Sequence, residues 1–215
     1  MIPPIKPPQQ GERYNPSNNL FDKLLAILKD KNPGYLGHDV TVKTILEKLR
    51  GEQLQFDLTQ QKTLVNILSD ANIPNFDSKA TTIVEILGLT KSDEAVNPII
   101  AWTDEHFGET WGEQPGWGED FDPYIAFEAL SMIGNEEAIK YLLLHAKKEK
   151  GNYSSQWDAL YHLGELEGAN YILMEEVGDF LLEFSKQNPD EFGHCALQSY
   201  NKIKHGTPRE EFSDL

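Results

Sequence analysis

The residues best suited to chemistry lie in one acidic stretch of the chain. From Ser92 to Ile139 there are 48 residues without a Lys or Arg, and twelve of them are carboxylates. Most of the formal net charge of −16 of the 215-residue chain comes from this stretch. Carboxylates at this density attract cations, so the chemistry to consider is binding of a metal ion or of a basic surface.

Two Trp-Gly-Glu triplets mark the centre of the stretch. They begin at Trp111 and Trp117, and the glycines and proline around them exclude a helix, so we predict a loop over 106–122. Tryptophan is a frequent anchor in protein interfaces and accepts a cation over its ring. We predict that the partner-binding residues are Asp104, Glu105, Glu109, Trp111, Glu113, Trp117, Glu119, Asp120 and Asp122.

The two tryptophans also allow a structural interpretation. Large aromatic side chains commonly cover the end of a helical core, and both indole rings can fold back in this way. In that case the binding surface is the concave face of the helices. The choice between the loop and the helix face stays open at this point.

Metal-binding and catalytic sites are not predicted. The acidic turn 119–122 lacks the alternating ligands, glycine and distal glutamate of an EF-hand loop. His194 directly precedes Cys195, so their side chains diverge on a helix. The closest approaches to a His-Glu metal pair, at 104–106 and 162–165, do not recur in other units. We therefore expect no cofactor, no metal and no enzyme activity.

Apolar residues at three- and four-residue spacing predict helices along the chain. The first helix begins near Ser17, and the second ends at Gly51, which can supply the left-handed conformation past a helix end. Asp57, with Gln60 three residues later, predicts a capping box that opens a third helix. No convincing alternation typical of a strand occurs, so the expected fold class is all-α.

From Ser78 onward one unit recurs: a helix, a tight turn and a second helix. Three first helices end with an aliphatic residue and a glycine, at Gly88, Gly134 and Gly164, and a weaker copy starts at Cys195. The first interval is 46 residues and the second is 30, and the excess is the loop with the two tryptophans. Repeat proteins often place such insertions on the binding face.

These patterns predict one domain between two tails. The order along the chain is a Pro-rich, disordered or extended tail over 1–16, a helical-repeat domain over 17–205 with units at about 77–107, 122–150, 154–187 and 190–205, and a polar tail over 206–215.

The run Ala-Leu-x-x-Ile-Gly-Asn-Glu-Glu-Ala-Ile-x-x-Leu-Leu, from Ala129 to Leu143, resembles a HEAT-like repeat. This armadillo-type repeat is of the short kind also found in phycobilin-lyase-type proteins, and the run from Ala159 to Leu173 is similar to it. The resemblance covers roughly 77–204, whereas the first 70 residues match only as generic helices. It implies a short α-α superhelix of helix pairs, preceded by a helical N-terminal cap.

Charge narrows the functions that this resemblance implies. An acidic surface repels phosphate backbones and anionic lipid, so we expect neither nucleic acid nor membrane as a partner. DNA-repair enzymes that use HEAT-like arrays need a basic groove, which this chain lacks. Di-iron hydroxylases on similar repeats carry adjacent His-Glu pairs, and no His is directly followed by Glu here.

The chain therefore resembles bacterial immunity proteins, which neutralise a toxin such as a nuclease with a basic cleft. We expect a basic protein partner, with carboxylates that steer association and tryptophans that anchor it. The single cysteine and the absence of a signal-like segment or a long apolar run predict a cytoplasmic protein. The alternatives are a lyase or another ligand-handling enzyme on the same scaffold, and an assembly scaffold.

Overall fold

The structure, a computed structural model, describes residues 16–30, 36–70, 76–107, 124–147, 153–166 and 171–205. Within these ranges every regular element is a helix and no β-strand occurs, which confirms the all-α class. No helix within them is long and apolar enough to cross a membrane. The elements are α1 (Pro16–Lys29), η1 (Leu36–His38), α2 (Val40–Arg50), α3 (Leu58–Leu68), α4 (Phe76–Leu89), η2 (Asp93–Ala95), α5 (Val96–Phe107), α6 (Tyr124–Ile133), α7 (Glu136–Ala146), α8 (Tyr153–Leu163), α9 (Tyr171–Gln187) and α10 (Glu191–His205).

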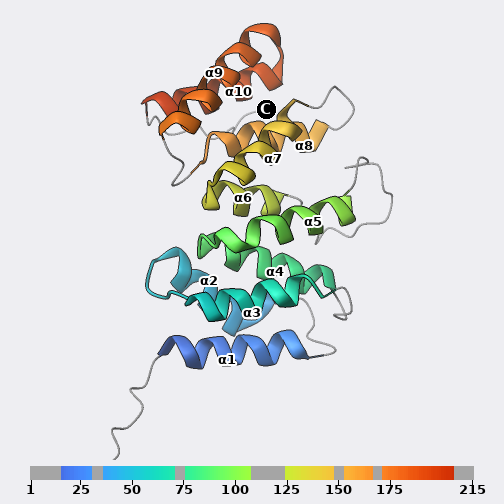
Figure 1. The fold of residues 1–215 in the computed structure, drawn as a ribbon, viewed down its shortest axis with the longest axis vertical. Coiled ribbons are helices and arrows are strands. Elements are labelled where there is room, and N and C mark those ends of the chain that lie inside the picture. The colour runs from blue at the N-terminus through green and yellow to red at the C-terminus, as the bar shows by residue number, and fades with distance from the viewer. Residues whose placement is uncertain are drawn as a thin grey trace, which may run out of the picture.

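The helices stack along the long axis of the molecule, from α1 at one end to α9 and α10 at the other (Figure 1). Every second helix packs on the next: α2 on α4, α4 on α6, α6 on α8, and α8 on α10. A second row consists of α3, α5 and α7, and α9 packs against α10. Helices close in sequence therefore share contacts, while the two ends of the stack lie far apart.

Local capping sets the starts of several helices. Asp57 accepts a hydrogen bond from the Gln60 backbone N–H, and the Gln60 side chain accepts one from the Asp57 N–H, which confirms the predicted capping box of α3. Asp39 caps α2 and Asn135 caps α7 through the same kind of contact. Each cap satisfies backbone donors that have no partner inside the helix.

Only some of the glycines that follow a predicted helix adopt the left-handed backbone conformation. Gly134, with φ of 64°, adopts this conformation after α6. The expectation for Gly51 is wrong, because its φ is −83° and the next residue, Glu52, has φ of 55°. Gly88 lies inside α4, and Lys91, with φ of 52°, takes the left-handed position beyond that helix.

One continuous apolar core runs through the stack. Leu130 of α6 and Leu160 of α8, which the repeat pattern pairs, are both fully buried. Cys195 of α10 is a buried thiol, as expected for a small apolar residue, and it forms no disulfide. Pro98 lies in the first turn of α5, where its missing N–H costs no intrahelical hydrogen bond.

Helix α1 is attached to the stack near both of its ends. Near its start, Asn18 Oδ1 accepts a 3.2 Å hydrogen bond from Gln60 Nε2, and the Phe21 and Phe56 rings meet edge to face at 5.1 Å. Just beyond its end, the buried Lys79 ammonium of α4 donates to the Asp30 carbonyl. A cation at this end also complements the negative end of the helix dipole.

Candidate functional site

The last turn of α5 carries two exposed carboxylates, Asp104 and Glu105. The two residues that precede them in α5, Trp102 and Thr103, are buried. The Thr103 hydroxyl donates a 2.7 Å hydrogen bond to the Ile99 carbonyl. A helix C-terminus already bears partial negative charge, so carboxylates there are each unfavourable by about 0.3–1 kcal/mol. Within the described parts of the chain neither carboxylate forms an ion pair.

Tyr141 of α7 fixes one of these carboxylates. Its hydroxyl donates a 2.7 Å hydrogen bond to Asp104 Oδ1, and the ring is almost fully buried. Burial first, and then the hydrogen bond to the Asp104 carboxylate, raise the pKa of Tyr141 well above its ordinary value. The phenol therefore stays protonated and keeps donating at neutral pH, which orients the Asp104 side chain.

Aromatic rings and two histidines fill the core behind this contact. The buried His145 ring lies 4.6 Å from the Tyr141 ring and 5.1 Å from the Phe127 ring. One helix further along, the buried His162 ring lies 4.3 Å from the Tyr124 ring. No group of three or more His, Cys, Asp or Glu side chains that could hold a metal ion occurs in the described ranges.

Cations from outside the acidic stretch neutralise some of its other carboxylates. The Lys62 Nζ of α3 lies 3.2 Å from Glu94 Oε1. Lys140 of α7 lies 2.8 Å from Glu136 and 3.7 Å from Glu137, and its hydrogen bond to Glu136 lowers the pKa of that carboxyl. The end of α5 differs from these places because, within the described ranges, the side-chain partner identified for Asp104 is a tyrosine hydroxyl and not a cation.

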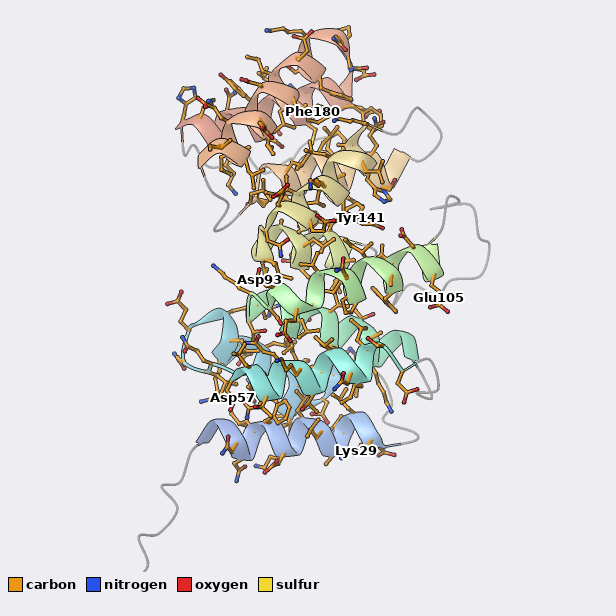
Figure 2. All side chains as sticks on the ribbon, viewed as in Figure 1. Lys29, Asp57, Asp93, Glu105, Tyr141 and Phe180 are labelled. Carbon is orange, nitrogen blue, oxygen red and sulfur yellow. The ribbon has the colours of Figure 1, made fainter. Side chains whose placement is uncertain are left out.

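Of the nine predicted site residues, the structure describes two. Glu105 lies at the end of α5, at the edge of the molecule opposite Asp57 and Asp93 (Figure 2). Asp104 lies in the same turn, and its carboxylate accepts the hydrogen bond from the Tyr141 hydroxyl. The other seven fall outside the described residues: Glu109, Trp111, Glu113, Trp117, Glu119, Asp120 and Asp122.

Tyr141 was not among the predicted site residues. It is 37 positions from Asp104 in the sequence, on the second helix of the following unit. The predicted repeat contained a signal for this contact, because the second helices of neighbouring units are expected to lie next to each other, as α5 and α7 do. Comparison of the chain with protein-family models, curated proteins and solved structures gave no match.

The arrangement at the end of α5 suits one kind of chemistry. It presents two exposed carboxylates in the last turn of a helix, at the negative end of that helix's dipole, and one of them, Asp104, is held by a hydrogen bond. The Tyr141 hydroxyl, which donates to Asp104, is held protonated, so it is unsuited to act as a nucleophile. Such a site favours an external cationic group, such as a lysine or arginine side chain.

Proposed function

We propose that this chain is a HEAT-like repeat protein that binds a basic protein partner through the end of α5 and the residues that follow it. In this proposal the partner is a toxin domain, such as a nuclease, and the chain is the immunity protein that neutralises it in the cytoplasm. Asp104 and Glu105 contribute to the contact directly. Trp111 and Trp117, together with the carboxylates between Glu109 and Asp122, supply anchors and further charge.

The observation that carries this proposal is the placement of Asp104 and Glu105. Two adjacent carboxylates in the last turn oppose the helix dipole, and no lysine or arginine in the described ranges offsets them. An unfavourable charge that a fold keeps at its surface is explained when a partner supplies the opposite charge. The two rows of alternating helices support the HEAT-like part of the proposal, because repeat arrays stack in this way.

The first experiment identifies the partner. We would express the tagged chain in its native host, purify it at low ionic strength and identify proteins that co-purify in equal amounts. A basic protein that is released as salt rises is the expected result, because screening weakens attraction between opposite charges beyond about 8 Å at physiological ionic strength. An acidic partner, or binding that strengthens with salt, would exclude the proposed mechanism.

The second experiment measures binding kinetics with the purified partner. Asp104→Asn combined with Glu105→Gln removes two negative charges from the end of α5, and Glu136→Gln combined with Glu137→Gln removes two from a place where Lys140 already pairs them. The first variant should slow association about three- to tenfold and the control less than about twofold. Equal effects would mean that only net charge matters.

Two further measurements separate anchoring and neutralisation from steering. Trp111→Ala with Trp117→Ala should mainly accelerate dissociation, because a buried aromatic anchor acts after encounter. Co-expression should restore growth of cells that produce the partner, and the Asp104→Asn, Glu105→Gln variant should restore it less well. If the partner binds this chain but does not harm the cell that produces it, the binding proposal stands and the immunity role is excluded.

A further inference from the structure

A pocket of about 430 Å³ opens between the segment that joins α2 to α3 and the end of α4. Two of its lining residues, Phe56 and Lys91, are one and two positions from Asp57 and Asp93, which Figure 2 shows on the side opposite Glu105. Its volume falls in the range of pockets that take small molecules, about 300–1,000 Å³. It is lined by Leu49, Glu52, Leu54, Gln55, Phe56, Gln61, Leu89, Thr90 and Lys91.

The charged residues of the pocket occupy a backbone position that normally belongs to glycine. Glu52 follows α2 and Lys91 follows α4, each with positive φ. In both places the next N–H bonds back across the helix end, from Gln53 to Lys48 at 2.8 Å and from Ser92 to Leu87 at 3.1 Å. This hydrogen bond defines the Schellman motif, whose left-handed residue is usually glycine because a Cβ is unfavourable there.

The chain therefore keeps two side chains at a cost that glycine would avoid. Both side chains line the same pocket, they carry opposite charges, and both are exposed at its rim. No other lining residue carries a full charge. Residues held in unfavourable backbone conformations persist where their side chains serve a function.

Much of the remaining lining is apolar or engaged in hydrogen bonds. Leu49, Leu54 and Phe56 are each at least 95% buried in the core and form its floor. Gln61 Nε2 donates to the Phe56 carbonyl at 2.9 Å, and the Thr90 hydroxyl bonds back within α4. These contacts fix part of the walls, and Glu52 and Lys91 are the lining residues that carry a full charge.

We propose that this pocket binds a zwitterionic small molecule with an apolar side chain, of the amino-acid or short-peptide class. The ammonium group of the ligand pairs with Glu52, its carboxylate pairs with Lys91, and its side chain rests on the Leu54 and Phe56 floor. Opposite charges over an apolar base match this chemistry and exclude a simple anion or cation. This site is independent of the protein contact at α5.

Calorimetric titration of the full chain tests the proposal with matched probes. The probes are the dipeptide Leu-Phe, its N-acetyl form, its C-terminal amide and the single amino acid phenylalanine. Saturable binding of Leu-Phe or phenylalanine is expected, and the tighter of the two identifies the peptide or the amino acid as the natural class. Blocking either terminal charge should weaken binding about two- to fivefold, the worth of a partly exposed ion pair.

Replacing Glu52 or Lys91 by glycine tests which side chain pairs with which charge of the ligand. Glu52→Gly should weaken binding of Leu-Phe about two- to fivefold but leave binding of the N-acetyl form unchanged, because that probe has already lost the ammonium. Lys91→Gly should behave in the same way toward the amide. Equal weakening of every probe, or no saturable heat for any probe at about 10 mM, would overturn the proposal.

Thermal unfolding separates loss of binding from loss of fold. Both glycine variants relieve an unfavourable backbone conformation, so each should raise the melting temperature by about 2–4 °C while it weakens the ligand. Opposite effects on stability and binding are the signature of side chains kept for function. A lower melting temperature in both variants would contradict the assignment of these two positions and with it the proposal.

Discussion

Gly88 of α4 and Ala129 of α6 bring the backbones of their two helices into contact. A Cβ added to Gly88 would lie 2.6 Å from the Ala129 Cα and 2.7 Å from its Cβ. Real carbon atoms do not approach this closely, and the atoms of a packed helix backbone cannot move aside as the tip of a flexible side chain can. The glycine therefore sets the distance between the two helices.

We expect Gly88→Ala to destabilise the protein although alanine is the better helix former. Propensity favours alanine by about 1 kcal/mol, but overpacking of a tight contact costs about 1–3 kcal/mol. Gly178→Ala in α9 is the matched control, because the nearest atom to its new Cβ is the flexible Lys204 Cε at 3.4 Å. Urea midpoints should fall for the first variant and rise slightly for the second. A rise for both would mean that α4 and α6 separate easily.

Leu130→Ala and Leu160→Ala should each be strongly destabilising. Both side chains are fully buried at matching places in neighbouring helix pairs, and cavities of this kind cost about 2–5 kcal/mol. Leu144→Ala is the control, since Leu144 is 57% exposed and should cost less than about 0.5 kcal/mol. Chemical denaturation of the three variants gives the comparison, and three equal midpoints would contradict the shared core.

Removing each of the two neighbouring carboxylates of α5 should have a different effect on the stability of the fold. Asp104→Ala loses the hydrogen bond from Tyr141 and should cost about 1–2 kcal/mol, whereas Glu105→Ala removes an unfavourable charge from a helix end and should be neutral or slightly stabilising. A double-mutant cycle of Asp104→Ala with Tyr141→Phe should show coupling of about 1 kcal/mol. Additive effects would exclude a contribution from the hydrogen bond.

Stability should fall at alkaline pH because of the buried Tyr141 and the partly buried Tyr124. The pKa values of Tyr141 and Tyr124 are raised mainly by burial, so the folded state keeps these protons at pH values where the unfolded state releases them. The unfolded state then binds fewer protons, and unfolding becomes easier as pH rises above about 10. Unfolding free energies of Tyr141→Phe should decline less steeply above this pH than those of the natural chain.

The sequence patterns that were correct are local ones. The capping box of Asp57 and Gln60 needs only residues three apart, and the burial of Leu130 and Leu160 follows from helical spacing within one unit. These features depend on the chain within one or two helical turns, where periodicity and capping preferences apply. The all-α class could be predicted for the same reason.

The features that could not be predicted depend on contacts between distant segments. Gly51 satisfies the local rule for a helix end, yet the register of the turn gives the left-handed position to Glu52. Gly88 carries the same helix-end signal but serves the approach of Ala129, which is 41 residues away. The contact of Tyr141 with Asp104 and the pocket beyond α4 likewise require knowledge of how the helices stack.

The close packing of α4 against α6 also indicates where the chain can be cut into two fragments. Since α6 packs on α4 as well as on its neighbour α5, contacts between helices join the two parts of the stack that lie before Phe107 and after Tyr124. Fragments 1–107 and 124–215 should therefore recombine into one particle when they are produced in the same cell, as the halves of a split reporter do. The Gly88→Ala substitution should impair this recombination more than it impairs the intact chain, because separate fragments lack the effective concentration that a covalent link provides.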